Sequence, residues 1–236
     1  MIMKRRLQGM FRFVWDLLSE HWVLALGSAA GLGLLFLRFK WWGRSPFYFL
    51  AWNLFLAWVP MVFAQLAAVN WDQRRPVLAM LAGLIWLGFF PNAPYIVTDL
   101  FHLKARPPVP FWLDLWIFIH FAWLGLMIGF ASLRSLHHAV TTRHGIGLGW
   151  IFAVLSLAAA SVGIYLGRFQ RWNTWSVLTH PQELVSGVMR GMETSTTDPR
   201  VFGFTAACFV FLLLAYLSIS SWNRPPRESQ RGADPW

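Results

Sequence analysis

Cysteine, charge and acidic side chains are all scarce in this sequence. Cys208 is the only cysteine among 236 residues, so the chain cannot form an internal disulfide or a thiolate metal cluster. Charged residues make up 13% of the chain, against about 25% in an ordinary soluble domain. Ten acidic residues stand against 20 lysines and arginines. These shortages exclude a disulfide-stapled scaffold and argue against a soluble globular protein.

Local catalytic signatures are missing as well. The sequence contains no HExxH zinc motif, no GxSxG nucleophile elbow and no Walker phosphate-binding loop. No catalytic residue and no cofactor is therefore indicated by spacing alone. Whether the protein is an enzyme depends on how separate polar residues come together in the fold.

Long hydrophobic segments are abundant in the sequence. Hydrophobic residues make up 57% of the chain, including 21 Phe and 16 Trp. A helix that crosses a bilayer needs about 20 mostly apolar residues, because the hydrocarbon layer is about 30 Å thick. Six stretches meet this length, roughly at 22–38, 46–69, 76–98, 110–133, 146–167 and 201–222. We therefore predict an all-α membrane protein with about six transmembrane helices in a single domain over residues 22–222.

Three segments outside the apolar stretches are predicted to lie at the membrane surface or in solvent. Residues 1–21 combine a basic start with apolar residues at helical spacing, which predicts an amphipathic helix on the membrane surface. Residues 181–192, between the fifth and sixth stretches, carry an apolar stripe that predicts a short interfacial helix. The polar tail, residues 223–236, is expected to be disordered.

The basic residues indicate the surface that the protein meets. The formal net charge is +10, but lysines and arginines gather at the ends of the apolar stretches, as at Arg38, Lys40 and Arg44. This pattern favours the lipid bilayer and its anionic lipid headgroups as partners, and not nucleic acid. No protein partner is indicated. The distribution of Lys and Arg among the connections favours cytoplasmic termini.

The segment FFPNAPYIVTDLFHL, residues 89–103, interrupts the third apolar stretch with two prolines. Pro91 cannot donate a helical hydrogen bond and clashes with the preceding turn. Phe90 and Ala93 precede prolines, which disfavours helical backbone angles at both. We therefore predict that the third helix breaks near Phe90 and that a second helix follows, with Asn92 as its N-cap.

The second helix would carry a polar stripe. Tyr95, Asp99 and His102 are four and three residues apart, so they share a helical face, with Thr98 beside it. Two interpretations stay open. Either Asp99 and His102 cap an interfacial helix, or the discontinuous helix builds a binding site at membrane depth.

Further polar residues fall within or beside the apolar stretches. Asp114 lies one turn into the fourth stretch, where a charge is costly unless it is paired or hydrated. Arg168 and Arg171 lie at the end of the fifth stretch. Either they extend to lipid phosphates, or, as we expect for at least one of them, they pair with Asp99 or Asp114. Asn53, in the second stretch, is expected to bond to a neighbouring helix.

Two further patterns concern packing and connections. Small residues at four-residue spacing let helices approach closely in lipid. Such contacts are expected at Gly27 and Gly31, at Gly125 and Gly129, and at Ala159, Gly163 and Gly167. A cluster of histidines between the fourth and fifth stretches is expected in a solvated connection and comprises His137, His138 and His144.

Four blocks resemble a bacterial membrane family called domain of unknown function 1361. They are WNLFLAWVP (52–60), the segment at 89–103, PFWLDL…FAWLGLMIGFASL (110–133) and YLGRFQRWNTW (165–175). The resemblance covers roughly residues 45 to 220 and implies a multi-pass protein of the bacterial inner membrane, with no mechanism attached. Its motif positions here are Asn53, Pro91, Asn92, Pro94, Tyr95, Thr98, Asp99, His102, Asp114, Arg168, Arg171, Trp172 and Asn173. Family members often carry an acid after the last block, where this chain has Ser176, which argues against a third carboxylate there.

Together these residues predict one polar cluster on one side of the helix bundle. The candidate substrate-binding residues are Asn92, Tyr95, Thr98, Asp99, His102, Asp114, Arg168, Arg171 and Asn173. Three functions fit them. The favoured one is binding or transport of a small polar, anionic or lipid-derived molecule. The others are a membrane enzyme for a lipid-linked substrate, with Asp99 and His102 as acid and base or as metal ligands, and a structural or assembly component.

Overall fold

The computed structural model describes residues 17–43, 47–169 and 199–222. Most of the predicted helix over residues 1–21 lies outside these ranges. The predicted interfacial helix at 181–192 and the tail at 223–236 lie outside them entirely, as do Arg171 and Asn173.

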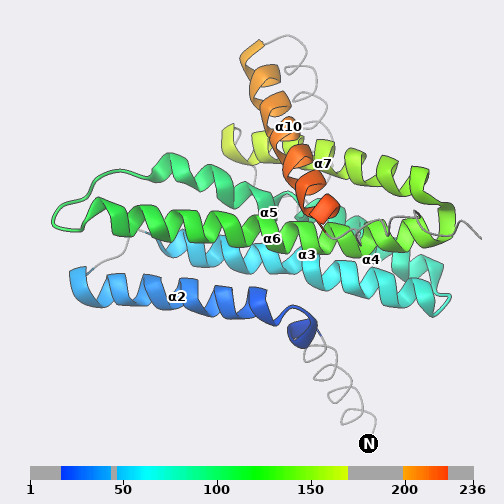
Figure 1. Ribbon diagram of the computed structural model, residues 1–236, viewed down its shortest axis with the longest axis horizontal. Helices are drawn as coiled ribbons and strands as arrows, with labels where there is room; N and C mark the ends of the chain where they lie inside the picture. Colours follow the sequence, from blue (N-terminus) through cyan, green and yellow to red (C-terminus); the bar gives the residue numbers. More distant parts are fainter. Residues whose placement is uncertain (1–16, 44–46, 170–198, 223–236) are drawn as a thin grey trace, which may run out of the picture.

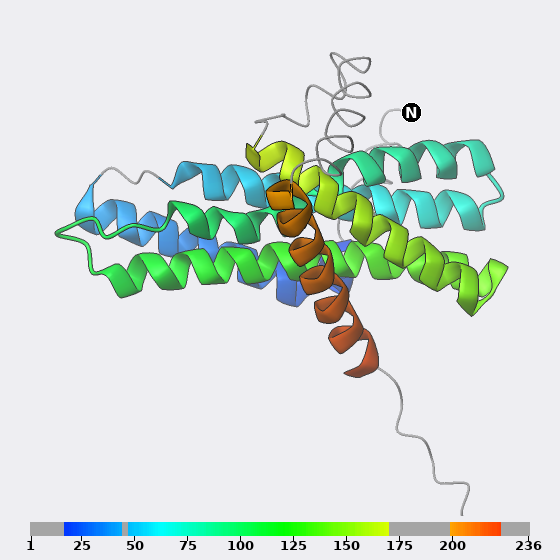
Figure 2. The ribbon, with the colours of Figure 1, turned by 90° about the horizontal axis from the view of Figure 1, so that it is seen from above.

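Six helical segments of the described residues are long and apolar enough to cross a membrane. They are α2 (Trp22–Trp42), α3 (Tyr48–Asp72), the broken segment Pro76–His102, α6 (Phe111–His144), α7 (Ile146–Phe169) and α10 (Pro199–Trp222). Figures 1 and 2 show α2, α3 and α6 running lengthwise along the bundle, with α10 crossing α7 steeply. The prediction of an all-α membrane protein with about six spans is confirmed.

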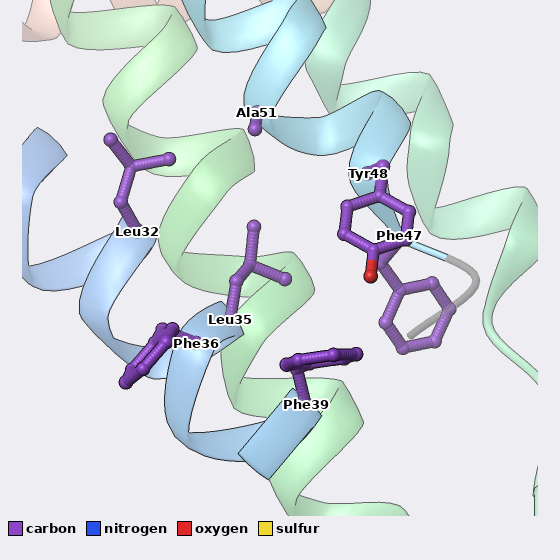
Figure 3. A pocket seen from close by; sticks show the side chains of 7 residues that line it. All are labelled: Leu32, Leu35, Phe36, Phe39, Phe47, Tyr48 and Ala51. Carbon is purple, nitrogen blue, oxygen red and sulfur yellow. The ribbon is translucent and has the colours of Figure 1, made fainter. Parts of the chain in front are cut away.

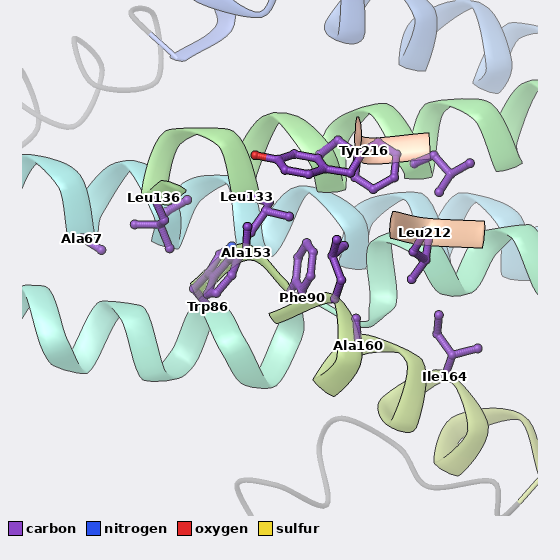
Figure 4. Packing of buried hydrophobic residues seen from close by; sticks show 14 of the residues in the cluster. Ala67, Trp86, Phe90, Leu133, Leu136, Ala153, Ala160, Ile164, Leu212 and Tyr216 are labelled. Carbon is purple, nitrogen blue, oxygen red and sulfur yellow. The ribbon is translucent and has the colours of Figure 1, made fainter. Parts of the chain in front are cut away.

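Helix α6 is the centre of this arrangement. Within its most apolar window 61% of the residues are buried, against 11% in α10. Two hydrophobic clusters lie against it. One fills the space between α2, α3 and the first half of α6. The other joins α3, α4, α7 and α10 to the second half of α6, with Trp86 and Phe90 stacked 4.8 Å apart at its centre (Figure 4).

The third segment breaks where the prolines predict. Helix α4 (Pro76–Phe89) is followed by one turn of α-helix, α5 (Asn92–Tyr95), and then by a 3₁₀ helix, η1 (Ile96–His102). The confirmed break therefore continues as a more tightly wound helix, in which residues three apart lie one above the other.

The break arises in hydrogen bonding and not in the backbone angles. Phe90 has φ −53° and ψ −40°, so the prediction that it leaves the helical region is wrong. Pro91 has no N–H to offer the preceding turn, and the N–H of Ala93 turns to the Phe90 carbonyl at 3.2 Å. Loss of the regular ladder is enough to end α4.

Asn92 does not cap the new helix, which corrects a second prediction. It is the first residue of α5, and its side-chain amide donates to the Phe89 carbonyl at 3.0 Å. It thereby serves one of the carbonyls that a helix end leaves without a partner. Its side chain is directed to the end of α4 and not to the start of α5.

Close contacts at glycines hold the broken segment in the bundle. A Cβ atom on Gly125 of α6 would lie 2.5 Å from the Ala93 carbonyl oxygen, and one on Gly163 of α7 would lie 2.6 Å from Pro91. Only residues without a side chain permit these approaches, as the four-residue spacing predicted. Ala159 is exposed and does not take part in such a contact.

The connection between the fourth and fifth spans is shorter than predicted. Helix α6 continues to His144, and Gly145, with φ 89°, is the only residue before α7. The three histidines are therefore helical. His138 and His144 are exposed, whereas His137 is half-buried: its Nδ1 lies 2.8 Å from the Tyr216 hydroxyl, and its ring packs against Trp150. The expectation of a loop is wrong because a helix can extend well beyond its apolar window.

Candidate functional site

Asn53, Asp99, His102, Asp114 and Arg168 belong to one end of the bundle, where α2, η1 and α7 end and α3 and α6 begin (Figures 1 and 2). They are organised around two buried carboxylates, Asp99 on η1 and Asp114 on α6. Each carboxylate has its own arginine partner. The single cluster predicted from sequence is therefore divided into two.

Asp99 is held chiefly by a neutral neighbour. The Asn53 amide on α3 donates to Asp99 Oδ2 at 2.7 Å, as expected for a buried amide facing another helix. Arg168 Nη1, at the end of α7, lies 3.7 Å from Asp99 Oδ1. The predicted pairing of an arginine at that place with Asp99 is confirmed. The separation exceeds the roughly 2.7–2.9 Å of a direct charge-assisted hydrogen bond.

The 3₁₀ winding of η1 selects which residues join Asp99. His102 follows by three positions and therefore lies along the same edge, and its Nδ1 is 3.3 Å from Arg168 Nη2. Tyr95 instead packs against the cluster around Trp86. Thr98 donates its hydroxyl to the Tyr95 carbonyl at 2.7 Å. The predicted stripe is thus reduced to Asp99 and His102.

The contact with Arg168 determines which nitrogen of the His102 ring carries the hydrogen. A guanidinium has donors only, so Nδ1 must accept, and the neutral imidazole carries its hydrogen on Nε2. His102 is exposed. The ring therefore presents an N–H donor at the rim of the site.

Arg168 joins the buried and exposed parts of this site. Its side chain is 13% exposed, and its guanidinium lies 5.1 Å from the centre of the Phe101 ring, a cation–π contact. Among the described residues, Asp99 supplies its only opposing charge. The guanidinium is thus positioned from three sides while remaining accessible.

Asp114 has a different partner from the one expected. Arg38 of α2 approaches it with two prongs, Nε to Oδ1 at 2.8 Å and Nη2 to Oδ2 at 3.3 Å. The side chains are 2% and 1% exposed, so the pair is closed to solvent. The expectation that Arg38 faces lipid headgroups is wrong, because its guanidinium is buried against Asp114. Arg168 pairs with Asp99 and not with Asp114, and Arg171 lies outside the described residues. The available signal was that Phe39, Trp41 and Trp42 continue the apolar run for one more turn beyond Arg38.

Phe47 lies between this closed pair and the loop after η1. The guanidinium carbons of Arg38 and Arg106 lie 4.7 and 4.9 Å from the centre of its ring. Phe47 itself has no exposed surface. Arg106 also donates to the His102 carbonyl at 3.3 Å, which ties the loop to the end of η1.

The two sites differ in what they can do chemically. The Arg38–Asp114 pair is saturated and buried, so it holds α2 against α6. The site at Asp99 offers Arg168 and the Nε2–H of His102 as donors, which suits an anionic group. In the described part of the chain, no three His, Cys, Asp or Glu side chains come together in a way that could hold a metal ion.

The fold and these sites define a multi-pass all-α membrane protein with a polar site at one end of its bundle. The model of the family described as "Protein of unknown function (DUF1361)" matches residues 52–215, so the chain belongs to that family, as its sequence blocks indicated. The match includes Asn53, Asp99, His102 and Arg168, whereas Arg38 lies before it. No curated protein and no solved structure matches the chain.

Proposed function

We propose that the protein binds a small anionic or lipid-derived molecule at the site formed by Asn53, Asp99, His102 and Arg168. The ligand anion is received by the Arg168 guanidinium and by Nε2–H of His102. Asp99, which is itself held by the Asn53 amide, keeps Arg168 in place. Transport of the same molecule across the membrane is an extension of this function.

The geometry of Arg168 carries the proposal. Arg38 is bound to its carboxylate at 2.8 Å, but Arg168 stays 3.7 Å from Asp99. Asp99 takes its short hydrogen bond from Asn53 instead. An incoming anion can therefore reach Arg168 without breaking a direct hydrogen bond to a carboxylate. Arg168 lies within a membrane-spanning helix, where a partly neutralised cation is costly and is typical of functional sites.

The charge around the site supports an anionic ligand. Lys104 and Arg106 follow η1 directly and add positive charge to the same end of the bundle. Within the residues that the structure describes, Asp99 is the only acid of this site. A concentration of one sign of charge attracts ligands of the opposite sign.

The other candidate residues take different places in the proposal. Arg171 and Asn173 lie three and five positions after Arg168, outside the described residues, and remain candidates. Asn92 and Thr98 use their side chains on backbone carbonyls within the broken segment. The enzyme alternative assigns acid–base roles to Asp99 and His102. Contact of Arg168 with both side chains favours binding.

We further propose that the protein lies in a bacterial inner membrane with cytoplasmic termini. Since the six spans alternate in direction, the end of the bundle with Asp99 and Arg168 then faces away from the cytoplasm. The ligand would reach the site from that side.

Ligand-induced stabilisation of the full-length protein in detergent tests the proposal. The probes are inorganic phosphate and a short-chain phosphatidic acid, which separate a small anion from a lipid-derived one. Saturating probe should stabilise the wild type by about 2.7 kcal/mol at 100 times its Kd. Arg168→Gln should abolish this gain, whereas Arg143→Gln should retain it because Arg143 pairs with Asp72 on the surface at 2.8 Å. An equal gain in both variants, or none in the wild type, contradicts the proposal.

A further inference from the structure

An apolar groove lies between the second half of α2 and the start of α3 (Figure 3). It has a volume of about 320 Å³, at the lower end of the roughly 300–1,000 Å³ of ligand pockets. Phe36 and Tyr48, which are 61% and 64% exposed, form outer walls. Buried Phe47 and the small Ala51 line it from the other side. The groove is therefore open to the surroundings of the bundle.

The groove lies along the second half of α2, between the centre of the bilayer and the surface at which α2 ends. Leu32, near the middle of this spanning helix, lies at one end of the lining, and Phe39, near the end of the helix, lies at the other. Trp41 and Trp42 follow, and Trp41 is 65% exposed. Tryptophans at the end of a span mark the headgroup level. The groove thus runs from the hydrocarbon to the interface.

Positive charge stands at the interfacial end of the groove. Lys40 is one turn beyond Phe36 on the same side of α2 and is exposed. The guanidinium carbon of Arg106 lies 4.9 Å from the centre of the Phe47 ring. Neither cation has an ion-pair partner within the part of the chain that the structure describes. Arg38, also nearby, is already neutralised by Asp114.

We propose that this groove binds one acyl chain of an anionic phospholipid, whose phosphate is held by Lys40 and Arg106. An amphiphile with an apolar chain and a negative head matches an apolar groove with cations at its interfacial end. The site uses none of the four residues proposed to bind a ligand at Asp99, although the charge of Arg106 lies near both sites.

Lipid retention by the full-length protein in intact mass spectra tests this site. Delipidated protein in detergent is titrated with phosphatidylglycerol and with phosphatidylcholine of identical chains. Wild type should retain one lipid, with a preference of roughly tenfold for phosphatidylglycerol because two cations contribute at the headgroup. Equal retention of both lipids would overturn the headgroup assignment.

Variants of the groove test the contact with the acyl chain separately from the contact with the headgroup. Ala51→Phe fills the groove and should abolish specific retention of both lipids, whereas Ala159→Phe, at an exposed position of α7, should not. If Ala51→Phe does not fold, Phe36→Ala removes an exposed wall and should weaken retention in the same way. Unchanged retention in the groove variants contradicts the proposal.

The headgroup variants change selectivity and not retention. Lys40→Gln combined with Arg106→Gln should remove the preference for phosphatidylglycerol while phosphatidylcholine binds as before. Arg75→Gln, at the opposite end of the bundle, should leave the preference intact.

Two results would point to a different arrangement. Loss of lipid in Arg168→Gln would merge this site with the one at Asp99 and overturn a separate groove site. A dimer that Ala51→Phe dissociates would show that a second copy of the chain occupies the groove.

Discussion

Arg38 and Asp114 form a two-pronged ion pair that is almost fully buried between α2 and α6. The residues are 76 positions apart in the chain, and the pair lies at the same end of the bundle as the candidate binding site. Beyond this bond, α2 packs on α6 through Gly27 and Gly31, which face Leu124 and His120. The pair therefore fixes the position of a helix that is otherwise largely exposed.

Removing one partner of this pair should strongly destabilise the protein. Asp114→Asn leaves the Arg38 charge buried without a counter-charge, which costs about 3–5 kcal/mol. The measurement is the free energy of unfolding in detergent. The double variant Arg38→Met/Asp114→Leu should recover most of the loss. As a control, Asp72→Asn removes an exposed pair and should change stability by about 0–1 kcal/mol. A loss below about 1 kcal/mol in Asp114→Asn would show that the pair is not closed to water.

The Asp99 site should respond in the opposite way. Asp99→Asn keeps an acceptor for Asn53 and breaks no direct hydrogen bond to Arg168, so stability should be unchanged within about 1 kcal/mol or should rise. Arg168→Gln loses the 3.3 Å contact with His102 but no direct hydrogen bond to Asp99, which keeps its short bond from Asn53, so its stability should also stay within about 1 kcal/mol. Both variants and their double are compared by melting temperature. Large losses with strong coupling between them would make the pair structural, and the binding proposal would fall.

The close approach of α6 to the broken segment predicts a contrast between two glycines. Gly125→Ala places a methyl group 2.5 Å from the Ala93 carbonyl oxygen, and such overpacking costs about 1–3 kcal/mol. At Gly83 of α4 a Cβ meets nothing within 4 Å, so Gly83→Ala should be neutral or stabilise by up to about 1 kcal/mol. Thermal unfolding of the two variants side by side measures the difference. Equal stability in both would mean that the helices separate easily here.

Labelling of single cysteines checks the orientation. In a Cys208→Ser background, Lys104→Cys places a thiol in the exposed loop after η1, at the end with the candidate site. A membrane-impermeant maleimide should label it in intact spheroplasts. Arg75→Cys, in the exposed connection at the other end, should be labelled only after permeabilisation. The reverse pattern would place the site on the cytoplasmic side.

Much of the fold could be predicted from sequence because the bilayer imposes local rules. A span needs a length of apolar residues and must satisfy its backbone hydrogen bonds within itself. The six spans and the break at Pro91 follow from these requirements. For the same reason, Asn53 is predicted as an amide that bonds to a neighbouring helix and Asp114 as a charge that needs a partner. The blocks of family resemblance lie in these same segments.

The choice of partners was decided only in the tertiary structure. Whether Asp114 meets Arg38 or Arg168 depends on how α2 and α7 are rotated and placed against α6, and no local pattern encodes that. The 3₁₀ winding of residues 96–102, which brings Asp99 and His102 onto one edge, also depends on packing beside Gly125 and Gly163, and Tyr95 before it packs half-buried against the cluster around Trp86. The sequence by itself determined a membrane protein of six spans with costly polar groups at known positions. Tertiary contacts decided which of those groups neutralise one another and which remain accessible, because pairing depends on distances between helices that are far apart in the chain.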